Sequence, residues 1–206
     1  MMDAVNHVTL HQYEISPFCA KARRVLHLKG VPFTVHNVSV SGSRSALKEL
    51  GPIGKLPVLE VDGRRIPDST EIARFLDAEV PEPPLWPQDA RDRALCHVLE
   101  DWADESLYFY EMAMRLTWPA NSRRWSLEAA RLDPAPVRAL APTLVPRIIG
   151  QRTRAQGVGR KPVALVLEEL DRHLEALDTL LGDGDWLVGG RLTLADLAVA
   201  SQVAAI

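Results

Sequence analysis

Residues 16–19 read Ser-Pro-Phe-Cys and follow a short apolar segment, Val8–Tyr13. Ser16 is a favourable N-cap, and Pro17 suits the first position of a helix because the N–H that proline lacks is not needed there. A Cys-Pro-x-Cys sequence at such a strand-to-helix turn would indicate a dithiol redox site. Here a hydroxyl stands at the first thiol position and only Cys19 remains. The stretch therefore predicts a site that stabilises a thiol supplied by another molecule.

The segments on either side of this turn predict alternating strands and helices, which together make an α/β domain over residues 1–80. Gly30 is suited to end the first helix in the left-handed conformation, and Asp62-Gly63 is typical of a hairpin turn. The expected elements are, in order, a strand at 8–13, a helix ending at Gly30, an extended segment at 31–38, a short helix within 42–51, a hairpin at 56–66 and a helix from Ser69.

A different organisation follows this domain. Four prolines crowd the segment 81–88, which predicts a stiff linker. Residues 89–206 predict an all-helical domain. Six prolines between 119 and 162 predict that the helices there are short. The other helical signals are a pattern over 91–116 with Leu95, Val98, Leu99, Trp102 and Leu107 as core candidates, a pattern over 163–181, and a capping box at Thr193–Asp196.

Composition excludes several classes of protein. Of the 206 residues, 47% are hydrophobic and 25% charged, which is the balance of a soluble globular protein. No apolar run is long enough to span a membrane, no secretory signal is evident, and two cysteines cannot form a disulfide framework, so we expect a cytoplasmic protein. A net charge of −3 does not favour nucleic acid as a partner, and we interpret the nine basic and two acidic residues of 123–161 as a solvated, arginine-rich region.

Four motifs, in order along the chain, resemble those of the glutathione S-transferase superfamily, and the resemblance covers nearly the whole sequence. It implies a thioredoxin-like N-terminal domain with the order βαβ-ββα, followed by an all-helical domain that we expect to be incomplete at the C-terminal end of this sequence. The Ser-Pro-Phe sequence looks most like the serine-type classes. The motifs are Ser16-Pro17-Phe18 followed by Lys21–Leu26 and Lys29–Phe33, then Gly54-Lys55-Leu56-Pro57-Val58-Leu59, Asp68-Ser69, and Thr193–Asp196 after Gly189-Gly190.

The resemblance implies that glutathione is the co-substrate, with no metal, and that the protein stabilises its thiolate. Ser16 is the expected catalytic residue, because a hydroxyl at a positively polarised helix N-terminus favours a thiolate. Lowering a thiol pKa by about two units corresponds to about 2.7 kcal/mol. Two alternatives stay open. Tyr13 offers a phenolic hydroxyl at the strand end, and Cys19 offers a thiol one turn into the helix.

The same resemblance implies the groups that hold the rest of glutathione. Pro57 would follow a cis peptide bond, and the backbone of Leu56 would pair with the cysteinyl part as an added strand does. Asp68 would meet the γ-glutamyl ammonium, and Ser69 would meet its carboxylate at a helix start. Arg44 is the candidate for the glycyl carboxylate, with Lys48 as its alternative.

These expectations together predict a glutathione transferase that conjugates glutathione to a small hydrophobic electrophile. By resemblance we also expect a homodimer and a role in detoxification. Two other functions stay open because a fold does not establish catalysis. One is a non-catalytic member of the fold that binds glutathione or another protein, and the other is a thiol-disulfide reductase that uses Cys19.

Overall fold

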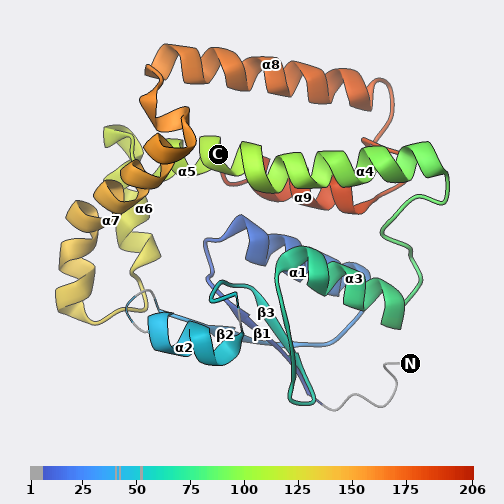
Figure 1. The fold of residues 1–206 in the computed structure, drawn as a ribbon, viewed down its shortest axis with the longest axis horizontal. Helices are drawn as coiled ribbons and strands as arrows, with labels where there is room; N and C mark the ends of the chain where they lie inside the picture. Colours follow the sequence, from blue (N-terminus) through green and yellow to red (C-terminus); the bar gives the residue numbers. More distant parts are fainter. Residues whose placement is uncertain (1–6, 40, 42, 52) are drawn as a thin grey trace. The chain divides into compact units, whose positions relative to one another are not determined.

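A computed structural model describes residues 7–39, 41, 43–51 and 53–206, of which 43–46 for the backbone only. The chain forms two compact units, Met1–Trp86 and Pro87–Ile206. The first unit contains a sheet with helices, and the second contains helices among its described residues (Figure 1). The predicted order of an α/β domain followed by a helical domain is confirmed.

Unit 1 is built on a four-stranded sheet with the strand order β2-β1-β3-β4. β1 pairs in parallel with β2, whereas the β1–β3 and β3–β4 pairs are antiparallel. Helices α1 and α3 pack against each other on one side of this sheet (Figure 1), which is the thioredoxin-like arrangement. The elements are β1 (Val8–Gln12), α1 (Pro17–Leu28), β2 (Thr34–Asn37), α2 (Ser43–Leu50), β3 (Val58–Val61), β4 (Arg64–Pro67) and α3 (Ser69–Glu79).

Local sequence explains the turns of unit 1. Gly30 follows α1 with φ +64°, and Asp62 and Gly63 join β3 to β4 with φ of 47° and 84°. Such angles favour glycine, which has no Cβ, and aspartate, which tolerates them. In β1 the side chains of Val8 and Leu10 are buried and alternate with more accessible ones, as expected for a strand with one face on the core.

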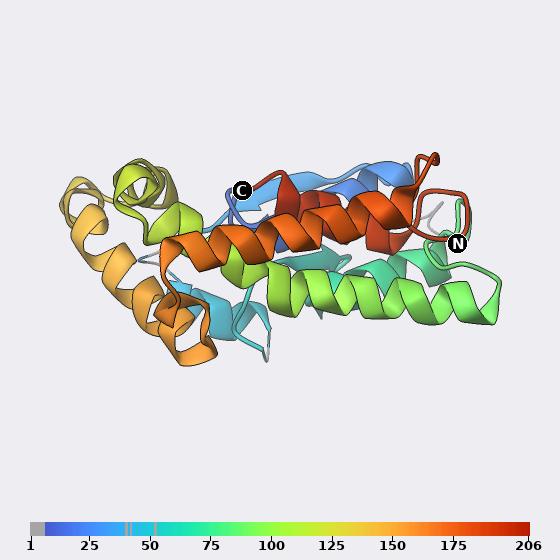
Figure 2. The same cartoon turned by 90° about the horizontal axis from the view of Figure 1, so that it is seen from above.

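Unit 2 contains helices that pack around α4 and α5. α9 lies against α4, while α6 and α7 pack against α5. Figure 2 shows α8 running alongside α4, and the rings of Trp102 and His173 meet edge to face with centroids 5.3 Å apart. The elements are α4 (Ala90–Trp102), a π-helical turn (Ala103–Leu107), α5 (Tyr108–Leu116), α6 (Pro119–Ala129), α7 (Ala135–Gln156), a 3₁₀ turn (Val158–Arg160), α8 (Val163–Leu181) and α9 (Leu194–Val203).

Two expectations for unit 2 were wrong. The proline-rich region was expected to hold only short helices, but α7 has 22 residues and includes Pro142 and Pro146. Each proline removes one helical hydrogen bond, yet packing against α5 and α6 keeps the segment helical. Val98 was expected in the core and is 64% exposed, because α4 presents this side chain away from its neighbours.

The predicted capping box at the start of α9 is confirmed. The Asp196 carboxylate accepts hydrogen bonds from the Thr193 N–H and the Thr193 hydroxyl, both at 2.7 Å. It also accepts the Leu187 N–H at 2.7 Å. One buried carboxylate therefore fixes both the start of α9 and the loop that precedes it.

Candidate functional site

Ser16 is the N-cap of α1, as the sequence predicts. Its backbone is extended, with φ −77° and ψ 127°, and its Oγ accepts the Cys19 N–H at 3.5 Å. The Ser16 N–H donates to the Tyr13 carbonyl at 3.0 Å, which closes the turn between β1 and α1. Ser16 is partly exposed, so its hydroxyl lies at the positive end of the α1 dipole and within reach of solvent.

Cys19 has a different environment from Ser16. Its side chain is fully buried, and its Sγ accepts the Tyr13 N–H at 3.3 Å. Burial raises the pKa of the Cys19 thiol above its usual range, and hydrogen bonds from Tyr13 and Ser16 oppose this shift only in part. Because the thiolate is the nucleophile, a buried thiol of raised pKa is a weak one.

The second part of the predicted site lies at the start of α3. Asp68 is its N-cap, and Oδ1 accepts the N–H groups of Thr70 at 2.8 Å and Glu71 at 3.3 Å. Its φ of +76° is unusual for a residue other than glycine. In the part of the chain that the structure describes, neither Asp68 Oδ2 nor the Ser69 N–H takes part in a hydrogen bond. Ser69 is 2% exposed, so Asp68 is the accessible member of the pair.

The start of β3 supplies the third part. The Leu56–Pro57 peptide bond is cis, as expected. The Pro57 carbonyl accepts the Asp68 N–H at 3.2 Å, which joins this segment to the start of α3. The Leu56 N–H and carbonyl make no hydrogen bond with any residue that the structure describes, so its backbone is available to a strand-like ligand.

These three parts meet at one end of the sheet. His11 pairs with Val58 in the β1–β3 register, so the segment leading to Ser16 runs beside Pro57. Lys21, in α1, donates from Nζ to Thr70 Oγ1, in the first turn of α3, at 3.2 Å. The N-terminal halves of α1 and α3 therefore approach each other, and helix N-termini attract anions.

For one residue of the predicted site, the structure does not describe where the side chain lies. Arg44 lies in α2, but its side chain is outside the described residues. Lys48 lies in the same helix and is exposed. Among the described residues, no group of three or more His, Cys, Asp or Glu side chains is arranged to hold a metal ion. None of the described helices combines the length and apolar character that crossing a membrane requires.

Sequence reasoning missed two buried lysines on α1. Lys21 is fully buried between α1 and α3, and the side chain of Lys29 is fully buried at the other end of the helix. Lys29 Nζ lies 2.6 Å from Asp77 Oδ1, 2.6 Å from the Val80 carbonyl and 2.7 Å from the Pro83 carbonyl. The available signal was their spacing, since Lys21, Val25 and Lys29 recur every four residues on the core side of α1.

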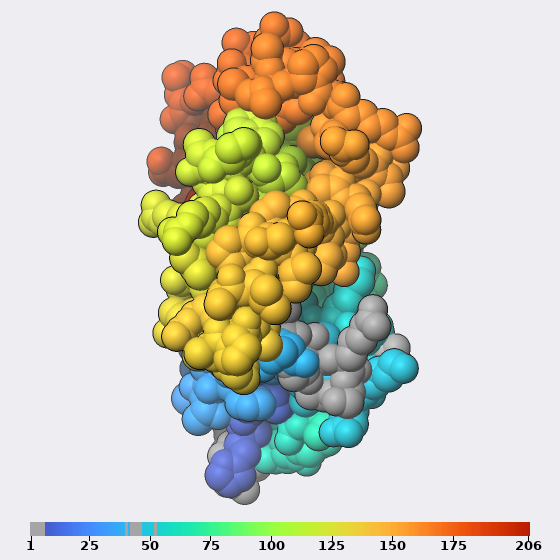
Figure 3. Space-filling model, turned by 90° about the vertical axis from the view of Figure 1, so that its left-hand side faces the viewer, coloured from blue at the N-terminus to red at the C-terminus, as the bar shows by residue number. Residues whose placement is uncertain are grey.

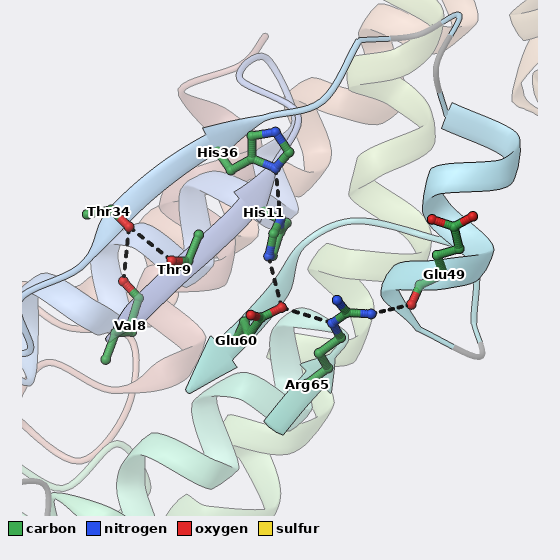
Figure 4. Close-up of polar contacts among 8 residues, drawn as sticks. All are labelled: Val8, Thr9, His11, Thr34, His36, Glu49, Glu60 and Arg65. Carbon is green, nitrogen blue, oxygen red and sulfur yellow. Dashed lines mark hydrogen bonds and ion pairs between the residues drawn. The ribbon is translucent and has the colours of Figure 1, made fainter. Parts of the chain in front are cut away.

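A polar cluster on the sheet face, which the sequence did not predict, includes His11 and His36 (Figure 4). Their Nδ1 atoms are 2.9 Å apart across the β1–β2 pair, and His11 Nε2 lies 3.4 Å from Glu60 Oε2. Glu60 also accepts from Arg65 Nε at 2.9 Å. Burial, together with the neighbouring His36, lowers the pKa of His11. This cluster joins all four strands of the sheet, and the residues predicted for glutathione lie outside it.

Unit 2 contains a buried ion pair between Glu111 and Arg115 on α5, with both side chains at most 4% exposed. The Arg115 guanidinium also stacks over the Trp125 ring, 3.8 Å from its centroid. Burial raises the pKa of Glu111 to about 7, although Arg115 acts in the opposite direction. The pair joins α5 to α6, and sequence reasoning gave no sign of it.

Comparison with known proteins identifies relatives of both units. Residues 10–84 match the model of the glutathione S-transferase N-terminal domain, and residues 129–205 match that of the C-terminal domain. FtsZ-localized protein A of Caulobacter vibrioides is 28% identical over 202 residues, which are 96% of this chain and 76% of that protein. Glutathione S-transferase U7 of Arabidopsis thaliana is 31% identical over 119 residues, which are 57% of this chain and 52% of that protein.

A solved structure extends the likeness to three dimensions. A glutathione S-transferase from Methylobacterium radiotolerans, in complex with glutathione sulfonate, superposes with a TM-score of 0.63 at 26% identity. The match covers 97% of this chain and 79% of that one. With both domain models matched in order on the expected fold, the chain belongs to the glutathione S-transferase superfamily.

Proposed function

We propose that the protein is a glutathione transferase that adds the glutathione thiolate to a small hydrophobic electrophile. The observation that carries this proposal is the position of Ser16, whose hydroxyl caps α1 beside the Leu56–Pro57 edge and the start of α3. The hydroxyl would donate to the glutathione sulfur, and the α1 dipole would further favour the anion.

Groups around Ser16 would hold the remainder of glutathione. The Leu56 backbone would pair with the cysteinyl part, next to Pro57. Asp68 would bind the γ-glutamyl ammonium through its accessible carboxylate, and the Ser69 N–H would donate to the γ-glutamyl carboxylate. Arg44 would meet the glycyl carboxylate. A homodimer, a cytoplasmic location and a role in detoxification belong to the same proposal.

The buried state of Cys19 favours a transferase over a thiol-disulfide reductase. A reductase of this type needs a reactive thiolate of its own, whereas burial keeps the Cys19 thiol protonated at neutral pH. Tyr13 stays the alternative for sulfur stabilisation, because it lies at the end of β1, three residues before Ser16.

Substitution of Ser16 tests the proposal directly. We expect Ser16→Gly to lower the rate of glutathione conjugation by about tenfold or more, or ~1.4 kcal/mol. Glycine is a tolerable N-cap, so this variant removes the hydroxyl while keeping most of the helix stability that Ser16→Ala would lose. Ser16→Thr keeps a hydroxyl and serves as the control. An unchanged rate for Ser16→Gly across a panel of aryl halides and enones would exclude Ser16 as the activating group.

A second candidate function is protein binding without catalysis. The observation in its favour is the relative that matches 96% of this chain, whose name, FtsZ-localized protein A, describes a location and no conjugation. Calorimetry with glutathione separates the two functions. Binding together with conjugation supports the transferase. Absence of any binding at about millimolar glutathione, a free energy weaker than about −4 kcal/mol, supports the second function.

A further inference from the structure

The outer face of α7 carries large aliphatic side chains that remain in contact with solvent. Leu140, Leu144 and Ile148 are 56%, 45% and 50% exposed. Residues four apart lie on the same side of a helix, so these three form one continuous stripe. Figure 3 shows α7, in amber, at the surface of the molecule on the side that faces the viewer. A contiguous stripe of exposed aliphatic side chains indicates an interaction surface, whereas single exposed aliphatic residues are common on any protein.

Arginines border this aliphatic stripe. Arg147 and Arg154 are exposed, and neither side chain forms an ion pair with a residue that the structure describes. The sequence around them lacks acidic residues, since 134–167 contains six basic residues and no Asp or Glu. Arginine binds carboxylates through two parallel hydrogen bonds. The face therefore fits a partner that presents carboxylates beside apolar side chains.

α8 presents such a surface. Leu167 and Leu174 are 41% and 39% exposed, although they belong to the apolar pattern of the helix. Asp171 and Asp178 each follow one of these leucines by four residues, so the carboxylates lie on the same side of α8 as the leucines. Both aspartates are exposed, and neither pairs with a residue that the structure describes.

The two helices also match in net charge. α7 contains four arginines and no acidic residue, a net +4, whereas α8 contains five acidic residues and one arginine, a net −4. The helices of one chain do not pair with each other, because they run in different directions from the connection at 157–162 (Figures 1 and 2). Two α7 faces brought together would place arginine against arginine, which is unfavourable.

We propose that α7 of one copy packs against α8 of a second copy of this chain. The aliphatic stripe of α7 would cover Leu167 and Leu174, and its arginines would face Asp171 and Asp178. The aliphatic contact supplies affinity, since exposed ion pairs alone contribute little, and the charges fix register and direction. In the proposed arrangement each copy uses its two surfaces toward two different neighbours, so the contact is heterologous and copies associate head to tail. It differs from the two-fold dimer that the family resemblance implies, and it does not depend on glutathione.

Sedimentation velocity of the full chain tests this proposal. At about 0.05 M NaCl the mean sedimentation coefficient is expected to rise with protein concentration beyond that of a dimer. At about 0.5 M NaCl screening should weaken the association about tenfold. A mass that does not change with concentration at low salt would overturn the proposal, as would association that salt leaves unaffected.

Reversing the charges on α7 or on α8 tests whether these two helices form the contact. Arg147→Glu/Arg154→Glu and Asp171→Lys/Asp178→Lys should each abolish association beyond a dimer when studied alone, and an equimolar mixture of the two variants should restore it. Failure of the mixture to associate beyond a dimer, or association of either variant alone beyond a dimer, would refute the pairing of α7 with α8. Arg91→Glu/Arg123→Glu is the control, because it alters the charge as the α7 variant does at exposed positions on other helices and should associate like the unaltered protein. Far-UV circular dichroism verifies that each variant is folded.

Discussion

The Lys29 ammonium holds together the end of α3 and the proline-rich segment after it. It donates to Asp77, Val80 and Pro83, and so uses all three of its hydrogen-bond donors. The segment that the sequence predicts to be a separate linker is therefore fixed, over its first residues, to the end of α1. Replacing Lys29 by methionine keeps an unbranched apolar side chain and removes the charge.

The expected loss of stability follows from the groups that lose their hydrogen-bond or ion-pair partner when Lys29 is replaced. Removing one member of a buried ion pair costs about 3–5 kcal/mol. Asp77 would keep its hydrogen bond from the Leu85 N–H at 2.8 Å and is 22% exposed, which moderates its penalty. The two carbonyls would lose a charged donor, and each such bond contributes about 1.5–3 kcal/mol. We therefore expect Lys29→Met to lower the free energy of unfolding by about 3 kcal/mol.

Urea unfolding, followed by circular dichroism, measures this loss. Lys55→Met is the matched control, because Lys55 is exposed, and its midpoint should stay within the error of the unaltered protein. Asp77→Asn should cost less than Lys29→Met, since an amide oxygen still accepts from both Lys29 and Leu85. A loss below about 1 kcal/mol for Lys29→Met would refute the argument that this ammonium stabilises the segment.

Three further predictions concern other buried groups. Asp196→Ala should destabilise unit 2 by about 3 kcal/mol in urea unfolding, because it leaves two N–H groups and a hydroxyl without their acceptor; Asp196→Asn should cost less, and equal losses would contradict this account. Burial raises the pKa of Glu111 to about 7, so between the ordinary pKa of a glutamate and about pH 7 the native state binds more protons than the unfolded state. The free energy of unfolding therefore falls as pH rises through that window. Unfolding measured across it should show this slope in the unaltered protein and not in Glu111→Gln, and equal slopes would speak against a raised pKa. Both cysteines are buried and free, so a colourimetric thiol reagent should label neither cysteine in the native protein at neutral pH and both after denaturation. Rapid labelling of Cys19 in the native protein would instead favour the thiol-disulfide reductase function.

Features that depend on a few neighbouring residues could be predicted from the sequence. The cap at Ser16, the left-handed Gly30 and the turn at Asp62-Gly63 are set by local chemistry, and all three are confirmed. The order of strands and helices followed from the same signals. The roles of Ser16 and Asp68 toward glutathione stay predictions, since they concern a molecule that the protein has to bind.

Features that depend on tertiary packing could not be predicted in this way. The prolines of α7 oppose a helix locally, but contacts with α5 and α6 outweigh that preference. The burial of Lys29 depends on carbonyls more than 50 residues away in sequence. Val98 has the spacing of a core residue, and only the arrangement of neighbouring helices decides that it is exposed.

The approach of two helix starts beside Leu56 has a consequence for how this region changes in evolution. Much of its hydrogen-bonding capacity belongs to the main chain, at Leu56 and at the Ser69 N–H. A side-chain substitution cannot delete a peptide group, so binding capacity there withstands most point mutations as long as the fold persists. In the proposed glutathione site, selection could therefore alter the surrounding side chains, and with them the specificity, while the main-chain groups proposed to hold the ligand stay in place.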